Sequence, residues 1–242
     1  MTTVAGGKSV YGASVGILML EACFPRIPGD MGNALTWPFP VHYRVVRDAS
    51  PERVVTQRAQ GLLDAFIEAG RDLVRHGADG ITTNCGFLSI YQPELAAALD
   101  VPVATSSLMQ IPMVQATLPP GRRVGVLTIS PKTMTPDHLS KIGVDPSTPV
   151  GGVDPDGEFF SKIIGNRPDL DVEKCRAENV AGALELKRAN PDIGAIVLEC
   201  TNMIPYAADV RRATGLPTYS IYSFVSWFQS SLQPRRFDLG QY

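Results

Sequence analysis

The stretch that decides the fold reads Gly80-Ile81-Thr82-Thr83-Asn84-Cys85-Gly86. Its first residues are mostly β-branched, which is typical of a short buried strand, and its last residues are typical of a turn. A second stretch of this kind reads Gly194-Ala195-Ile196-Val197-Leu198-Glu199-Cys200. The chain therefore contains two predicted strands that each end at a cysteine, and these cysteines are 115 residues apart.

Other landmarks repeat at similar intervals. A proline in a short predicted strand follows each cysteine by 17 residues, at Pro102 and at Pro217. The apolar run at 14–20 contains a Val-Gly pair, and the run at 123–129 contains another at an offset of 109. We interpret the shared offsets as a tandem duplication of one structural unit.

Helical patterns lie between these strands. The apolar spacing in residues 51–76 predicts one helix that begins at Pro51 and ends before Gly77. Residues 24–41 are rich in Gly and Pro and predict a long loop, a kind of segment that is usually functional. Because strands and helices alternate along the chain, the sequence predicts an α/β fold with parallel strands covered by helices.

The charge composition indicates which kinds of partner the protein is not expected to bind. The 242 residues carry 22 Lys and Arg against 24 Asp and Glu, a formal net charge of -2, which gives no electrostatic reason to expect nucleic acid or an anionic membrane. The N-terminus does not resemble a secretory signal, and no apolar run approaches the length of a membrane helix. We therefore expect a cytoplasmic protein whose four cysteines are free thiols.

Two of these thiols are candidates for catalysis. In parallel α/β sheets, ligands bind beyond the carboxyl ends of the strands, where Cys85 and Cys200 are expected to lie. Two related halves that face each other would bring both thiols to one cleft. A helix is predicted to begin after each cysteine, so that its N–H groups would lower the thiol pKa and would bind a carboxylate. A carboxylate held between two such thiols is arranged for racemisation at its α-carbon without a cofactor.

These residues resemble the aspartate/glutamate racemase superfamily, which also contains hydantoin racemases, maleate isomerases and arylmalonate decarboxylases. The resemblance extends from the first strand to about residue 228 and rests on the segments 82–86 and 198–202. It implies two pseudo-symmetric doubly wound halves with parallel sheets and an active site in the cleft between them. The expected halves are residues 1–103 with 218–242, and residues 104–217.

The resemblance also implies roles for individual residues. Cys85 and Cys200 would be the thiol pair, and Asn84, Thr201 and Asn202 would lie near the substrate carboxylate. The N–H groups at the helix starts around Gly86, Thr201 and Asn202 would hold that carboxylate. Gly86 differs from the Asn that glutamate and aspartate racemases typically carry after the first cysteine. The arylmalonate decarboxylases lack the first cysteine, so its presence here favours a racemase or an isomerase over a decarboxylase.

Four further residues are candidates for substrate binding. Arg26 and Asp30 lie in the loop after the first strand, where they could contact a carboxylate and an amino group, although an ion pair within the loop explains them equally well. Thr105 and Ser106 follow another strand, where they could line the cleft or cap a helix. The three histidines of the chain have no metal-ligand spacing, so no metal site is predicted.

The sequence therefore predicts a cofactor-independent isomerase, namely an amino-acid racemase that uses Cys85 and Cys200 as alternating base and acid. Its substrate would be a small carboxylate, and nothing in the sequence identifies an interface of a homo-oligomer. A hydantoin racemase or a maleate-type cis–trans isomerase would fit the same scaffold. An alternative of another class is a carboxylate-binding protein without turnover.

Overall fold

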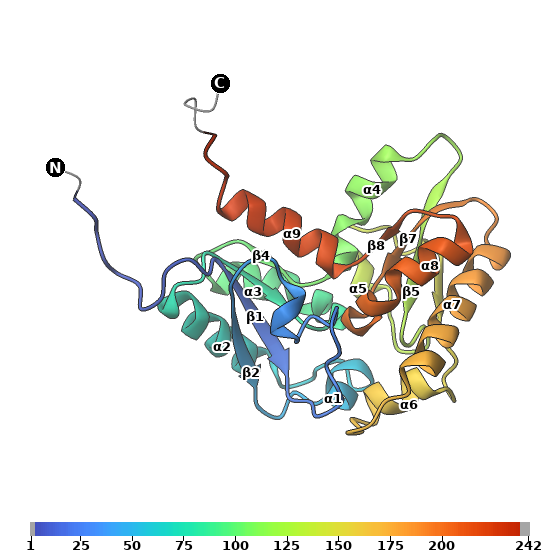
Figure 1. The fold of residues 1–242 in the computed structure, drawn as a ribbon, viewed down its shortest axis with the longest axis horizontal. Helices are drawn as coiled ribbons and strands as arrows, with labels where there is room; N and C mark the ends of the chain where they lie inside the picture. The colour runs from blue at the N-terminus through green and yellow to red at the C-terminus, as the bar shows by residue number, and fades with distance from the viewer. Residues whose placement is uncertain (1–2, 238–242) are drawn as a thin grey trace.

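The fold is built on two parallel β-sheets. The computed structural model describes residues 3–237 and contains two four-stranded sheets flanked by helices (Figure 1). The first sheet has the order β2-β1-β3-β4 and the second the order β6-β5-β7-β8, with every neighbouring pair parallel. The strands are β1 (Val15–Leu20), β2 (Val41–Val46), β3 (Gly80–Thr83), β4 (Val103–Ala104), β5 (Arg123–Thr128), β6 (Val150–Gly152), β7 (Ile193–Leu198) and β8 (Thr218–Tyr219).

The two sheets have the same order of strands. In each half, the second strand lies at one edge, followed by the first, the third and the fourth. This identity of topology confirms the predicted α/β architecture of two similar halves. Strands β1, β3, β5 and β7 lie at the centre of their sheets and read as largely apolar runs because helices or the other half cover both faces.

Helices connect the strands and cover the sheets. The α-helices are α1 (Pro51–Val55), α2 (Leu63–His76), α3 (Gln92–Ala98), α4 (Ile111–Thr117), α5 (Asp137–Ser140), α6 (Glu158–Ile164), α7 (Val172–Ala189), α8 (Ala207–Thr214) and α9 (Ile221–Leu232). The described part of the chain also forms four short 3₁₀ segments, which are η1 (Ala34–Thr36), η2 (Gly86–Tyr91), η3 (Ser107–Gln110) and η4 (Thr201–Tyr206). Among the described residues, none of these helices combines the length and the apolar character needed to cross a bilayer.

The helix predicted over residues 51–76 is two helices. Between α1 and α2, Arg58 and Ala59 have φ angles of 55° and 54°, and Gly61 has a φ of 75°. These left-handed conformations end α1 and allow the chain to turn before α2 begins. Ala59 is buried in the core, so packing stabilises a backbone conformation that its side chain disfavours.

The predicted boundaries of the halves place two short segments in the wrong half. Ala104 belongs to β4 of the first sheet, and β8 pairs with β7 in the second sheet, whereas the prediction assigned each to the other half. Helix α9 does return to the first half, where its buried residues Ile221, Phe224 and Val225 form one cluster with residues of β1. Residues 1–2 and 238–242 of the predicted first half lie outside the described residues.

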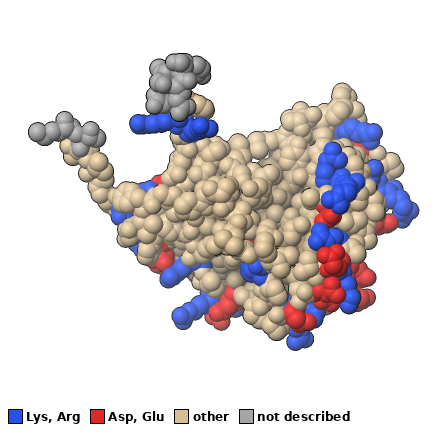
Figure 2. Space-filling model, viewed as in Figure 1, with Lys and Arg blue, Asp and Glu red and all other residues tan. Residues whose placement is uncertain are grey.

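Charged side chains are unevenly distributed on the face that Figure 2 shows. They gather over α6, α7 and α8, whereas the part over α9 carries few of them. On α7 and α8 many of them form ion pairs of opposite sign, such as Arg188 with Glu185 at 2.7 Å and Arg212 with Asp209 at 3.2 Å. The charges over these helices therefore balance within the same surface.

Candidate active site

A cavity lies where the carboxyl ends of β3 and β7 approach each other. Cys85 lies between β3 and η2 and Cys200 between β7 and η4, and each occupies the N-cap position of its 3₁₀ segment. Both thiols line this cavity and are 8% and 7% exposed. The two halves therefore bring together the pair of cysteines that the internal repeat singled out.

Direct hydrogen bonds hold the Cys200 turn against the Cys85 turn and the end of β7 against η3. The hydroxyl of Thr201 donates to the carbonyl of Asn84 at 2.6 Å. The hydroxyl of Ser107, at the start of η3, donates to the carbonyl of Leu198 at 2.7 Å. Since all four groups are buried, these bonds fix the relative position of the turns in a region that water does not reach.

The pKa of both thiols is raised rather than lowered. Burial is the main cause, and the carboxylate of the neighbouring Glu199 raises the pKa of Cys85 and of Cys200 further. The backbone N–H groups of Phe87 and Asn202 act in the opposite direction, as the sequence predicted for the helix starts. The predicted lowering is wrong because desolvation and a nearby negative charge outweigh these amides.

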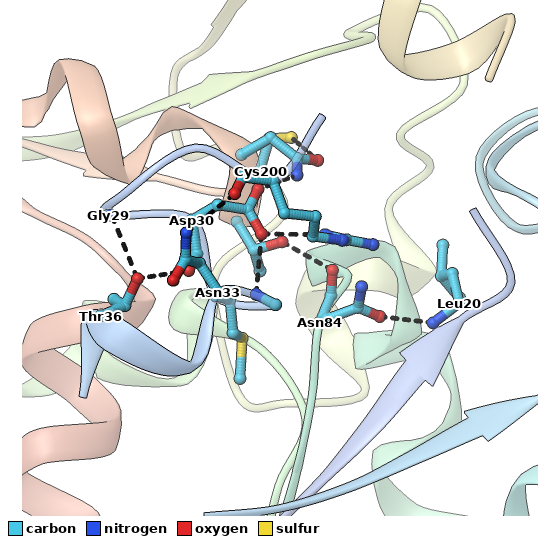
Figure 3. Close-up of polar contacts among 12 residues, drawn as sticks. Leu20, Gly29, Asp30, Asn33, Thr36, Asn84 and Cys200 are labelled. Atoms are coloured by element: carbon cyan, nitrogen blue, oxygen red, sulfur yellow. Dashed lines mark hydrogen bonds and ion pairs between the residues drawn. The ribbon is translucent and has the colours of Figure 1, made fainter. Parts of the chain in front are cut away.

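A loop between β1 and β2 covers one side of the cavity and is tied to Cys200. Asp30 of this loop accepts hydrogen bonds from the guanidinium of Arg26 at 3.0 Å and from the amide of Asn202 at 2.5 Å. The other end of the Asn202 side chain accepts from the thiol of Cys200 at 3.5 Å. Figure 3 shows Asp30 close to Thr36 of its own loop on one side and to Cys200 on the other.

Arg26 and Asp30 have different places in this arrangement. The Arg26 side chain lines the cavity, and its guanidinium lies 4.5 Å from the ring centre of Phe24. Asp30 is 3% exposed and does not line the cavity, and both of its carboxylate oxygens are engaged by neighbouring groups. The carboxylate of Asp30 therefore organises the loop, Arg26 and Asn202, and is not free for a substrate amino group.

Other predicted site residues are held by structural contacts. Ser106 caps η3 by accepting from the N–H of Leu108, and Thr105 donates to the side chain of Gln92. Both are fully buried and lie outside the cavity lining. Asn84 lines the cavity, but its side-chain oxygen accepts from the N–H of Leu20, as Figure 3 shows.

Sequence reasoning missed Glu199, which is the acidic residue nearest to the thiol pair. Its side chain is 1% exposed, and one carboxyl oxygen accepts from the hydroxyl of Thr128 at 2.6 Å. Burial raises the pKa of Glu199 to about 7, against the effect of hydrogen bonds from Thr128 and the backbone of Ile129. An ionisable residue at the end of an otherwise apolar strand, directly before Cys200, was the available signal.

The rest of the lining is largely apolar. It includes Phe24 of the loop, Val55, Phe87, Ile129, Ile163 and Ile164. The room for a water-sized sphere is about 20 Å³, which is the space of roughly one water molecule. Within residues 3–237, no group of three or more His, Cys, Asp or Glu side chains is arranged to hold a metal ion.

Comparisons of the sequence identify close relatives. The chain is 30% identical to a protein of Durusdinium sp. clade D that is named dimethylsulfoniopropionate lyase, over 95% of this chain and 79% of that protein. It is also 30% identical to dimethylsulfoniopropionate lyase 7 of Emiliania huxleyi, over 90% of this chain and 67% of that protein. No family model matches the chain.

Comparisons of the structure identify the fold. A liganded double mutant of arylmalonate decarboxylase matches with a TM-score of 0.60 at 16% identity, over 93% of this chain and 94% of that one. An aspartate racemase of Picrophilus torridus matches with a TM-score of 0.56 at 12% identity, over 93% of this chain and 96% of that one. These matches confirm the fold of the aspartate/glutamate racemase superfamily.

The names of the sequence relatives correct the predicted activity. They are lyases, so the prediction of a racemase, and with it of an isomerase of amino-acid metabolism, is wrong. The same names contradict the hydantoin racemase, the maleate-type isomerase and the binding protein without turnover. The sequence could not make this distinction because one scaffold carries several reactions. On the strength of these matches along most of its length, the chain belongs to the dimethylsulfoniopropionate lyase family and has the fold of the aspartate/glutamate racemase superfamily.

Proposed function

We propose that this protein cleaves dimethylsulfoniopropionate into dimethyl sulfide and acrylate. The observation that carries the proposal is the 30% identity, along 95% of the chain, to a Durusdinium lyase named for this compound. The cavity supports it, since it combines two thiols and a guanidinium group with a largely apolar lining.

The chemistry of the substrate defines what such a site must do. Dimethylsulfoniopropionate has a carboxylate at one end and a dimethylsulfonium cation at the other, with two methylene groups between them. A base removes a proton from the carbon next to the carboxylate, and the electron pair of that C–H bond forms the double bond of acrylate. The C–S bond breaks with its electrons on sulfur, so that dimethyl sulfide leaves as a neutral molecule.

We assign the base to the thiol pair of Cys85 and Cys200, one of which acts as a thiolate. Burial raises the pKa of both thiols, so the thiolate needs a compensating charge. The sulfonium group of the bound substrate supplies a positive charge beside it. The substrate carboxylate lies beside Arg26, where charge that develops during proton removal is stabilised.

The size of the cavity requires movement of its cover. Room for about one water molecule is too little for a substrate with a carboxylate, two methylenes and a dimethylsulfonium group. Phe24 and Arg26 come from the loop after β1, whereas Ile163 and Ile164 come from α6 of the other half. We therefore propose that the loop moves away from α6 to admit the substrate and closes again to exclude water.

The test is the release of both products by the purified protein. Incubation with dimethylsulfoniopropionate is expected to yield dimethyl sulfide and acrylate in equal amounts, measured by gas chromatography and by NMR. A protein that releases neither product from this compound would not have the proposed function.

The role of the thiols is tested with single substitutions in the same assay. Cys85→Ala and Cys200→Ala are each expected to lower kcat/KM by about 100-fold or more, which is the contribution of a positioned base. Cys175→Ala is the matched control, because that thiol is also buried but lies in α7 outside the cavity lining. Full activity of both cavity variants would exclude the thiol pair as the base.

A further inference from the structure

The carboxyl group of Glu199 is only half satisfied by hydrogen bonds. One oxygen accepts from Thr128, whereas the other, Oε1, is buried and has no hydrogen-bond partner among the described residues. Glu199 is one of the residues that line the cavity. A buried carboxylate oxygen without a partner is costly, and in native proteins it usually has a specific reason.

The opposite half leaves room for this carboxyl group. A Cβ atom at position 86 would overlap the Oε1 and Cδ atoms of Glu199 as well as its backbone carbonyl. Gly86 directly follows Cys85, so the absence of a side chain there lets the carboxyl group lie against the turn that carries the first thiol. Oε1 is thus positioned between the two cysteine turns, where a substrate must bind to be within reach of both thiols.

Among residues 3–237, no cationic side chain forms an ion pair with Glu199. Arg26 is the one other charged residue in the described lining, and its guanidinium is bonded to Asp30 and stacked on Phe24. The neighbouring lining is apolar and offers surface to methyl groups. A carboxylate oxygen without a partner, next to apolar side chains, fits a cation whose charge is surrounded by methyl groups.

We propose that Glu199 is the residue that recognises the cationic end of the substrate and makes the site selective for methylated sulfonium or ammonium carboxylates. The identity of the substrate rests on the function proposed above, whereas the selectivity for a cation rests on the geometry of Glu199. The carboxylate approaches the cation through Oε1, while Thr128 holds the second oxygen. The substrate is thereby oriented with its carboxylate towards Arg26 and its cation towards β7.

Two molecules of the same shape and different charge test the proposal. The cationic probe, named for its ammonium end, is the zwitterion 3-(dimethylammonio)propionate. The neutral probe, named for its uncharged isopropyl end, is 4-methylpentanoate, which has a C–H group in place of the protonated nitrogen. Their inhibition constants are measured with the native protein and with Glu199→Gln, which keeps the shape of the side chain without its charge. The native protein is expected to prefer the cationic probe by about tenfold or more, and Glu199→Gln to bind both probes within about threefold.

A matched variant separates this role from a general effect of removing a carboxylate. Glu178 accepts hydrogen bonds from the N–H groups of Glu158 and Phe159 at 2.8 Å and lies outside the cavity lining. Glu178→Gln is expected to keep the native preference for the cationic probe. Binding of the neutral probe by Glu199→Gln also verifies that this variant is folded.

The outcomes distinguish this inference from the proposed function. Equal binding of the two probes by the native protein overturns the role of Glu199, whether or not the Gln variant folds. An unchanged preference in Glu199→Gln overturns it as well. If the native protein cleaves no dimethylsulfoniopropionate but loses its preference for the cation in Glu199→Gln, the proposed function is wrong and the role of Glu199 stands.

Discussion

At the scale of single residues, Glu199 is the group of the cavity that changes charge near neutral pH. The other titratable and charged groups around it are Cys85, Cys200 and Arg26. Burial raises the pKa of both thiols above the ordinary value of a cysteine, so they stay protonated near neutral pH. A role for Glu199, which directly follows the apolar strand β7, could not be assigned from the sequence, because its burial depends on the approach of Gly86 from the other half.

This titration predicts how stability depends on pH. The pKa of Glu199 is about 7 in the folded protein and about 4.5 in the unfolded chain, so between these values the unfolded chain loses the proton first. The free energy of unfolding should therefore fall as pH rises through this window, by about 3 kcal/mol in total. Glu199→Gln lacks this contribution. Urea denaturation of the native protein and of Glu199→Gln at pH 5 and at pH 8 gives the free energy of unfolding of each. The difference in this free energy between the two proteins should change from pH 5 to pH 8, and a difference that stays constant contradicts the prediction.

At the scale of elements, the loop between β1 and β2 has unequal attachments to the two halves. On the first half it is anchored by Met31 and Trp37, which are buried against α9 and β1. It is tied to the second half by Asp30 and by Cys23, whose N–H and thiol bond to Asn166 at 2.7 and 3.0 Å. The Gly and Pro content predicted a functional loop, but not its partners, because Asn166 lies 143 positions away in the sequence.

The contact with Asn166 is expected to control how often this loop opens. Asn166 has a φ of 51°, so Asn166→Gly suits the backbone and removes the acceptor of the Cys23 N–H. Hydrogen exchange of the amides in residues 23–36 should then become about 5- to 10-fold faster, the effect of losing roughly one hydrogen bond. Asn190→Ala, at the end of α7, is the control that should leave these amides unchanged. Unchanged exchange in Asn166→Gly would mean that the hydrogen bond from the Cys23 N–H does not control how often the loop opens.

At the scale of the whole molecule, the repeat was the part of the fold that the sequence could predict. Local apolar runs and cysteine spacing are sufficient to recognise two similar α/β units and their facing thiols. The break between α1 and α2 depends on left-handed residues such as Arg58, whose conformation long-range packing decides. The class of reaction was also beyond local reasoning, because related scaffolds that share the thiols differ in the substrate that they orient.

The contact between the halves predicts a large effect of one methyl group. In Gly86→Ala, the new Cβ would overlap the carboxyl and carbonyl groups of Glu199 and force the two cysteine turns apart. We expect the free energy of unfolding to fall by about 1–3 kcal/mol, as in other overpacked cores, and lyase activity to be lost. Thermal unfolding and product release measure the two effects. Gly6→Ala, with no atom within 4 Å of the new Cβ, should change neither, and a stable, active Gly86→Ala would contradict the tight contact.

The buried carboxyl group of Glu199 has a consequence for protein engineering. Because its ionised form lowers the free energy of unfolding, variants with a neutral side chain at this position gain resistance to heat. A library selected only for survival at high temperature would therefore accumulate substitutions of Glu199. The most robust clones would be the ones that no longer distinguish a sulfonium compound from its uncharged analogue, so such a selection has to include a substrate.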